Sequence, residues 1–181
     1  PVGLPVGDYE VVVTDANGCT ETETVPVNTP NPLILDVSTV DVTCFGFNDG
    51  SATSQVSGGT PPYSYAWTGS PSTGPDAPDL VAGSYTLVVT DTDDCSVSET
   101  VTINQPPQLI AQGDGTDANC NGNADGSIDL TVIGGVAGYT YNWNNGAGTA
   151  EDPVNLAANT YTVTVTDGNG CTTTETVVID E

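Results

Sequence analysis

The strongest constraint on the fold is a gap-free internal repeat of 76 residues. Three related turn sequences, TDANGC, TDTDDC and TDGNGC, begin at Thr14, Thr90 and Thr166, so their aspartates and cysteines recur at this spacing. When residues 33–105 are aligned with residues 109–181 without a gap, 28 of 73 positions are identical. A fixed period of this length indicates a row of similar folding units.

Two proline-rich stretches separate these units. They read NTPNP at residues 28–32 and QPPQ at residues 105–108. Proline fixes the backbone angle φ and favours an extended chain, so we expect both stretches to be short, semi-rigid linkers. Residues 1–30 are then the C-terminal part of a truncated repeat. Residues 31–107 and 108–181 are complete repeats, and the units form a rod.

Each unit contains segments in which apolar and polar residues alternate. YTVTVTD, which begins at Tyr161, places a tyrosine and two valines on one face and threonines on the other. This period of two predicts half-buried strands. YSYAW and YTYNW, which begin at Tyr63 and Tyr139, place two tyrosines and a tryptophan on one face. We expect six aromatic side chains to fill the core: Tyr63, Trp67, Tyr85, Tyr139, Trp143 and Tyr161.

Turn sequences separate the predicted strands. In the first complete repeat, strands are expected at residues 33–43, 51–57 and 95–103, with a short one near residues 79–81. Asn-Gly in TDANGC and TDGNGC is typical of hairpin turns, because both residues accept positive φ. About seven short strands in ~75 residues, without helix periodicity, predict an all-β fold of tandem immunoglobulin-like, Greek-key β-sandwich domains.

One recurring residue does not fit simple alternation. Glu23, Glu99 and Glu175 have the same parity as the apolar Val101 and Ile103. Alternation would therefore turn these carboxylates toward the core. The sequence requires a β-bulge or an edge strand at these positions.

The charge of the chain has one sign only. The chain contains 24 acidic residues and no Lys, Arg, His or Met, which gives a formal net charge of −24 at pH 7. Nucleic-acid-binding proteins use Lys and Arg to displace counterions from phosphates, so this composition argues against a nucleic-acid partner. The same reasoning argues against anionic membrane surfaces. No apolar run approaches the ~20 residues that a membrane span needs.

The missing residue types also argue against catalysis. Without His or Lys, the chain has no ordinary base to activate a Ser, Thr or Cys nucleophile. Its acidic residues are scattered over turns and are not paired in an apolar cleft, as a glycosidase would need. A zinc site is not expected either, because there is no His and no Cys-x-x-Cys pair. We expect the protein not to be an enzyme.

The acidic turns leave two interpretations open. Hard cations such as Ca²⁺ take oxygen ligands, and the candidate calcium ligands are Asp49, Asp91, Asp93, Asp125, Asp167 and Asn169. The alternative is that Asp and Asn in these turns accept hydrogen bonds from their own backbone. No other cofactor is expected.

Trp67 and Trp143 also have a second interpretation. Together with the neighbouring tyrosines they could form a platform that stacks against sugars, and the protein would then be a glycan-binding module. The main interpretation is that they fill the sandwich core, because they share one parity of a central strand. Exposure of the indole faces distinguishes the two.

Three motifs of the first complete repeat are DGSATSQVSGGTPPYSYAW, LVAGSYTLVVTDTDDCS and TVTINQP. Together they resemble the SprB-type repeat of very large cell-surface proteins in gliding and related Bacteroidetes. The resemblance covers two full units and the end of a third, and it departs in the last unit at GGVAGY and AANTY. It implies an extracellular protein on a bacterial cell surface, and a structural role in the stalk of an adhesin or filament. The implied partners are neighbouring repeats or like subunits, with glycan-binding or calcium-dependent adhesion as the alternative.

An exported protein meets oxidising conditions, so its cysteines are expected to pair. Pairing within a unit would join Cys44 to Cys95 and Cys120 to Cys171. In an immunoglobulin-like strand order, however, the loop at Cys44 and the turn at Cys95 lie at opposite ends of the domain. A seven-residue strand spans roughly 23 Å, whereas a disulfide requires Cα atoms ~4.4–6.8 Å apart.

In a head-to-tail rod, the first loop of one unit faces the last turn of the next. We therefore favour a disulfide between Cys44 and Cys171 across the joint. The partners of Cys19, Cys95 and Cys120 then lie in units outside this stretch. Within-unit pairs and free thiols are the alternatives.

Overall fold

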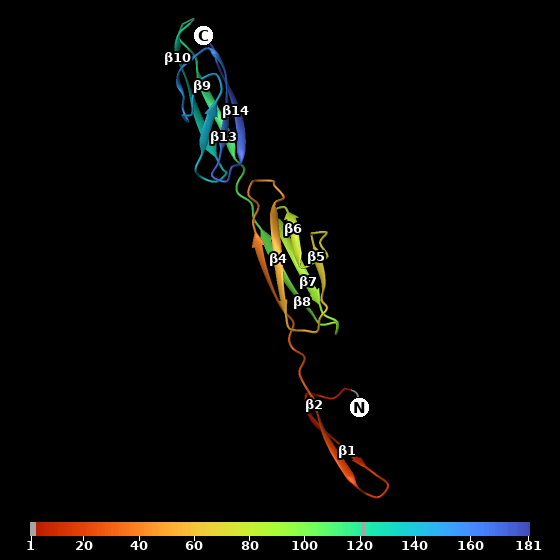
Figure 1. Cartoon of the computed structure of the whole chain (residues 1–181). Helices are drawn as coiled ribbons and strands as arrows, with labels where there is room; N and C mark the ends of the chain where they lie inside the picture. Colours follow the sequence, from red (N-terminus) through yellow and green to blue (C-terminus); the bar gives the residue numbers. More distant parts are fainter. Residues whose placement is uncertain (1–2, 121) are drawn as a thin grey trace.

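The structure, a computed structural model, describes residues 3–120 and 122–181. Every regular element in these residues is a β-strand, and they contain no helix that could cross a membrane. Figure 1 shows a hairpin near the N-terminus, then one sandwich, then a second sandwich that ends near the C-terminus, all in a row. The predicted all-β fold is confirmed.

The first sandwich, all of whose residues are described, has six strands. They are β3 (Ile34–Val40), β4 (Gly50–Ser57), β5 (Ser64–Thr68), β6 (Asp76–Leu80), β7 (Gly83–Thr90) and β8 (Ser96–Ile103). One sheet has the order β3-β4-β6 and the other the order β5-β7-β8, and every neighbouring pair is antiparallel. The chain crosses to the second sheet at β5 and returns at β6, which is the connectivity of an immunoglobulin-like Greek key.

The expected seventh strand is absent from this sandwich. The residues between β5 and β6 include SPSTGP, whose prolines and glycine do not favour a strand ladder. They form a loop instead, with the carbonyl of Gly74 accepting from Trp67 and that of Pro75 accepting from Ser54.

The second sandwich repeats this arrangement in its described residues. Its strands are β9 (Ile110–Thr116), β10 (Ala124–Ile133), β11 (Thr140–Trp143), β12 (Val154–Ala157), β13 (Asn159–Thr166) and β14 (Thr172–Ile179). The sheet orders are β12-β10-β9 and β11-β13-β14. Because each strand has its counterpart one repeat earlier, the tandem organisation of the fold follows directly from the sequence repeat.

The N-terminal hairpin consists of β1 (Gly7–Thr14) and β2 (Thr20–Val27), which pair only with each other in the described residues. Val11 and Val13 on β1 are 49% and 64% exposed. Their counterparts one repeat later, Leu87 and Val89, are 0% exposed in the first sandwich. The hairpin therefore has the strand pattern of the last two strands of a sandwich, without a facing sheet.

Strict alternation on the central strands builds the two cores. Leu87 and Val89 on β7, and Val163 and Val165 on β13, are completely buried. The residues between them face outward, as the sequence pattern predicted. Burying a side chain of this size stabilises the fold by about 1.5–3 kcal/mol.

A tyrosine at the start of the penultimate strand anchors each unit. The hydroxyl of Tyr85 donates to the carbonyl oxygen of Val81 at 3.0 Å, and that of Tyr161 donates to Ala157 at 2.9 Å. Tyr9 makes the same bond to Pro5. This is the tyrosine corner of immunoglobulin-like domains, which accounts for the 76-residue spacing of these tyrosines.

The recurring glutamates lie on edge strands. Glu99 on β8 pairs with Leu87, and Glu175 on β14 pairs with Val163, in continuous register. Because β8 and β14 are the outer strands of their sheets, these half-buried side chains can reach solvent. Of the two options that the sequence left open, the edge strand is correct and no bulge is needed.

The first strand of the first sandwich is shorter than predicted, because the chain leaves its sheet after Val40. Asp41 accepts a hydrogen bond from the backbone N–H of Asn104, and the N–H of Val42 donates to the carbonyl of Asn104. The start of the loop that follows β3 is thereby fixed to the end of β8. Both strands thus end at the same end of the sandwich.

The hairpin turns differ from the predicted type. The Asn-Gly pairs were expected to place both residues at positive φ, but in the last turn of each unit only one position does so. It is occupied by Gly18 (φ 86°), Asp94 (φ 62°) and Gly170 (φ 84°). A single left-handed residue after a type I turn is the geometry of longer hairpin loops, and the preceding aspartate determines it, as described below.

Candidate functional site

The joint between the two sandwiches is closed by a disulfide. Cys44, in the loop after β3, is bonded to Cys171, in the turn before β14, with a Cα–Cα distance of 5.7 Å and a sequence separation of 127. This is the pairing that strand order favoured. Cys95 and Cys120, the within-unit alternatives, are exposed free thiols in the structure, as is Cys19.

Polar contacts reinforce this joint. Asn169 donates from Nδ2 to the carbonyl oxygen of Thr43 at 2.9 Å, so a side chain of the second sandwich holds the backbone of the first. The backbone N–H of Gly46 donates to Oε1 of Gln105 in the linker at 3.0 Å. The loop after β3 therefore contacts both the linker and the following sandwich.

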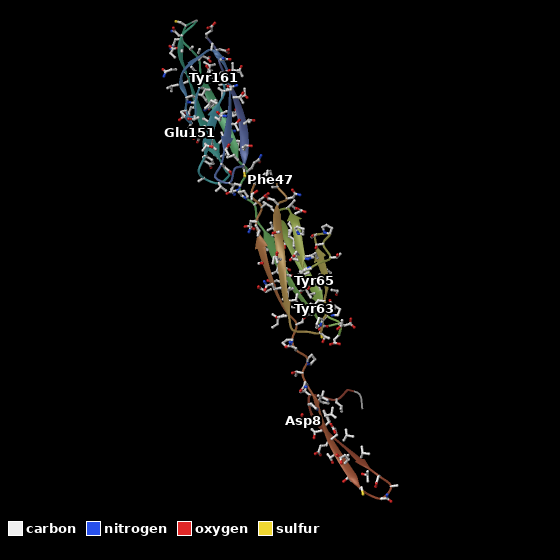
Figure 2. All side chains as sticks on the ribbon, viewed as in Figure 1. Asp8, Phe47, Tyr63, Tyr65, Glu151 and Tyr161 are labelled. Carbon is white, nitrogen blue, oxygen red and sulfur yellow. A yellow bond between two sulfur atoms is a disulfide. The ribbon has the colours of Figure 1, made fainter. Side chains whose placement is uncertain are left out.

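A groove of about 370 Å³ runs beside the disulfide. Its walls include Phe45, Phe47, Pro106, Pro107 and Leu109. Phe45 and Phe47, the only phenylalanines in the sequence, are 47% and 53% exposed. Figure 2 shows Phe47 at the joint between the sandwiches.

The linker is fixed to the sandwich that follows it. The N–H of Gly135 donates to the carbonyl of Pro107 at 2.9 Å. At Gly134 (φ 76°), a Cβ atom would lie only 1.8 Å from the carbonyl oxygen of Gln108, so no other residue fits this position without a shift. The close approach of glycine to the linker restricts the direction in which the second sandwich leaves the joint.

The same clamp occurs at the start of the first sandwich. Gly59 donates to the carbonyl of Asn31 at 3.0 Å, and a Cβ at Gly58 would lie 1.8 Å from the carbonyl oxygen of Pro32. The Gly-Gly pair therefore fixes the linker in both repeats.

A buried aspartate organises the turn beside each linker. Asp167 is 5% exposed, and its Oδ1 accepts from the N–H groups of Asn169 and Cys171 while its Oδ2 accepts from Val136. Burial opposes ionisation of this carboxyl, but the donation from these backbone N–H groups outweighs it. The pKa of Asp167 consequently lies below its ordinary value of 3.8.

Asp91 has the same role in the first sandwich, where it is 7% exposed. The N–H of Thr60 is the main cause that holds its pKa below the ordinary value, against the opposing effect of burial and with further help from Cys95 and Asp93. The carboxylate thus joins the turn that carries the cysteine to the loop that carries the Gly-Gly pair. The aspartate of the TD-x-x-x-C motif therefore holds together the turn and the loop that lie beside each linker.

Asp49 and Asp125 accept hydrogen bonds within the loop that follows the first strand of each sandwich. Asp49 accepts from both the hydroxyl and the N–H of Thr43, and Asp125 accepts from both Nδ2 and the N–H of Asn119. These bonds, the side-chain ones first, lower the pKa of each carboxyl below its ordinary value. The loop that presents Cys44 is therefore ordered by Asp49.

The structure does not bring the six candidate calcium ligands together. Asp91 and Asp93 lie in the last turn of the first sandwich, whereas Asp167 and Asn169 lie in that of the second. Among residues 3–120 and 122–181, no group of three or more His, Cys, Asp or Glu side chains is placed to hold a metal ion. The observed partners of Asp49, Asp91, Asp125 and Asp167 are hydrogen-bond donors of the protein, which is the turn interpretation.

The predicted aromatic residues lie in or against the cores. Trp67 and Trp143 are 8% and 5% exposed, and their Nε1 atoms donate to the carbonyls of Gly74 and Ala150. Tyr85 and Tyr161 are buried, and the half-buried Tyr63 and Tyr139 donate to Gly58 and Gly134. The two indoles are too enclosed to form a sugar platform.

Sequence reasoning overlooked three parts of the joint: the linker clamp at the Gly-Gly pairs, the phenylalanines, and the contact from Asn169 to Thr43. One signal was available for the clamp, because Gly-Gly recurs at residues 58–59 and 134–135, always five residues before a tyrosine. Asn169 could not have been found, since its counterpart in the first sandwich is Asp93.

No curated protein sequence matches this chain. One solved structure that it resembles contains the N-terminal eight immunoglobulin domains of Down Syndrome Cell Adhesion Molecule (DSCAM) isoform 1.30.30, at 14% sequence identity and a TM-score of 0.47. Another is described as the structural basis for Dscam isoform specificity, at 13% sequence identity and a TM-score of 0.35. The alignments cover 96% of this chain but only 28% and 54% of those chains.

The family comparison is more specific. Residues 37–72 and 113–148 each match the model of the SprB repeat. The first match runs from β3 through β5, and the second runs from β9 past β11, so both cover the same strands of their sandwiches. Each of the two sandwiches therefore contains a stretch that matches the SprB repeat.

Proposed function

We propose that this chain is a segment of the shaft of an extracellular surface adhesin or filament, and that it acts as a non-catalytic spacer. SprB repeats in an immunoglobulin-like fold with a disulfide suggest an extracellular or surface protein, because disulfides persist in oxidising compartments. The sequence has no His or Lys to serve as an ordinary base for a nucleophile, which supports a non-catalytic role.

The Cys44–Cys171 disulfide is the observation that carries this proposal. It joins two successive sandwiches and not two strands of one sandwich. A bond in this position adds nothing to a catalytic or ligand-binding cleft within a domain, but it limits the relative motion of neighbours. Together with the linker clamps at Gly58 and Gly134, it supports a stiff rod.

We propose that the partners of this chain are further repeats of the same kind. The turn at Cys95 has the same aspartate-bonded geometry as the turn at Cys171, and so presents its thiol to a preceding unit. Cys19 is exposed at the position equivalent to Cys95, and Cys120 is exposed at the position equivalent to Cys44. The exposed Val11 and Val13 of the hairpin would be covered by the rest of a first sandwich.

The alternative functions receive less support. A glycan platform on the central aromatic strand would need exposed indoles, but Trp67 and Trp143 are buried. A calcium-dependent adhesion module would need converging oxygen ligands, whereas the candidate carboxylates bond to the protein's own donors.

Electron microscopy of the native cell surface tests the proposal. Antibodies against the two sandwiches should label fibres along their length, at many points on each fibre. Label confined to fibre tips would favour a ligand-binding module. Label found only inside permeabilised cells would contradict an extracellular shaft.

Small-angle scattering of the isolated chain gives a second test. The proposal predicts a rod. Its pair-distance distribution should have a peak at short distances, which reflects the width of a sandwich, and a long tail, which reflects the length of the chain of domains. A compact particle, in which the sandwiches fold back on each other, would contradict the spacer role.

A further inference from the structure

The two disulfide-bonded cysteines lie at the ends of two particular strands. Cys44 follows β3, the first strand of the first sandwich, and Cys171 precedes β14, the last strand of the second sandwich. The bond therefore creates a covalent path that enters the first sandwich along β3 and leaves the second along β14. Every residue between the two cysteines lies outside this path.

The path crosses each sandwich from one end to the other. β3 starts where the linker residue Asn31 is bonded to Gly59, and the chain after it, at Val42, is bonded to Asn104 at the opposite end. In the second sandwich, the carbonyl of Asp180 after β14 accepts from the N–H of Ala118, which follows the first strand in the same way. Figure 1 shows the C-terminus at the end of the second sandwich that is distant from the joint.

Both strands are already close to full extension. A β-strand rises ~3.3 Å per residue, and a chain cannot exceed ~3.3–3.6 Å per residue. Tension along this path can therefore lengthen β3 or β14 very little. In the part of the chain that the structure describes, both are edge strands, and each is hydrogen-bonded to a single neighbouring strand, β3 to β4 and β14 to β13.

We propose that the Cys44–Cys171 disulfide is a tension bypass, which makes the pair of sandwiches almost inextensible even when a sandwich loses its fold. Without the bond, force applied to the chain ends acts on both whole sandwiches. A sandwich that unfolds then adds the full extended length of its chain to the distance between the ends. With the bond, the 127 residues of separation between the cysteines are excluded from the path. This inference deepens the proposed shaft role, because a shaft under load keeps its length.

Single-molecule force spectroscopy on residues 1–181, held through enzymatic tags at the two termini, tests the bypass. The three other cysteines are changed to serine (C19S, C95S and C120S) to prevent unrelated bonds. Thiol titration must first show no free thiol in this oxidised variant; two free thiols would overturn the proposal at once. The same count on the unaltered chain should give three free thiols.

The expected result is a difference in contour length. At ~3.3–3.6 Å per residue, the 127 residues of separation correspond to about 420–460 Å of length that is hidden when the bond is present. Reduction with a phosphine should release this length. The C44S change in the same background should release it with or without reductant, which controls for effects of the phosphine itself.

Equal total contour lengths before and after reduction would overturn the bypass. Scattering on the same samples separates this failure from failure of the shaft role. A rod whose oxidised form extends to full length has no bypass but remains a spacer, whereas a compact particle removes the spacer role whatever its force curve shows.

Discussion

The Nδ2 atom of Asn169 lies 2.9 Å from the carbonyl oxygen of Thr43, which precedes it by 126 residues, and this hydrogen bond crosses the joint next to the disulfide. The backbone N–H of the same asparagine donates to Asp167. A single residue thus connects the aspartate-ordered turn of the second sandwich with the loop of the first. The disulfide lies between two loops that are each held by hydrogen bonds to an aspartate of their own sandwich.

Asn169→Asp should weaken the disulfide. The change removes the donor and places a carboxylate against a carbonyl oxygen, so the two thiols are held together less well. Loss of about 1 kcal/mol of hydrogen-bond stabilisation corresponds to an approximately fivefold lower equilibrium constant for forming the Cys44–Cys171 bond. Titration with glutathione redox buffers, followed by alkylation and mass spectrometry, measures it.

Asp93→Asn is the matched control, because Asp93 is the counterpart of Asn169 in the first sandwich and lies away from this joint. It should leave the same equilibrium unchanged. Asn169→Asp adds one negative charge and Asp93→Asn removes one. Shifts of equal size and opposite sign in the two variants would therefore show that the effect is one of net charge and not of the contact to Thr43.

Asp94→Gly should stabilise the first sandwich. Asp94 has φ 62°, a left-handed conformation that its counterparts achieve with Gly18 and Gly170. Removing the side chain relieves a cost of about 1 kcal/mol, which corresponds to a melting temperature about 4–8 °C higher for a domain of this size. Scanning calorimetry of the isolated sandwich gives the value, and G170D should lower the stability of the second sandwich.

The buried carboxylates should make stability depend on pH in the acidic range. Asp91 and Asp167 have pKa values below 3.8 in the folded state, so below this pH the unfolded state binds more protons. Their contribution is fully present at neutral pH and is lost as the pH falls from about 4 through the lowered pKa values. Melting temperatures between pH 7 and pH 2.5 should show this loss.

Asp167→Asn isolates the effect. It removes the charge and turns one amide donor toward the N–H of Val136, so the variant should melt several degrees below the wild type at pH 7, with a difference that shrinks below pH 4. Asp36→Asn, at an exposed position on β3, removes one charge without this network and should show no such trend. A constant difference at all pH values would mean that ionisation of Asp167 is not the cause.

A chelator should leave the melting temperature unchanged. The oxygens of Asp49, Asp125 and Asp167 already accept hydrogen bonds from the protein, so stability of these turns does not require a cation. Thermal unfolding is compared with and without EDTA at matched ionic strength. A melting temperature that rises with added Ca²⁺ but not with the equivalent NaCl would restore calcium as a ligand of these turns.

The fold was predictable because its information is local and repeated. Alternation on β7 and β13, the tryptophans and the 76-residue period all follow from residue types in sequence. Strand order alone then favoured the Cys44–Cys171 pair, since the within-unit alternative would join opposite ends of a sandwich.

The parts that were not predictable depend on contacts between distant segments. Asp91 and Asp167 look like ordinary turn residues until the loops at Thr60 and Val136 are folded against them. The φ pattern of the turns was misjudged for the same reason: Asn-Gly favours two left-handed residues locally, but the bonds to Asp15 and Asp167 select a turn with one. Contacts across the joint do not produce a repeating pattern in the sequence from which they could be predicted.

The most direct test is a non-reducing peptide map of the native protein, cut at acidic residues because the chain has no trypsin site. Such cuts place Cys44, Cys95, Cys120 and Cys171 on separate peptides, so each pairing gives a distinct mass. The account predicts recovery of the Cys44 peptide linked to the Cys171 peptide, and its disappearance on reduction. Recovery of Cys44 linked to Cys95 would contradict the disulfide across the joint, and with it the rod and the tension bypass that depend on it.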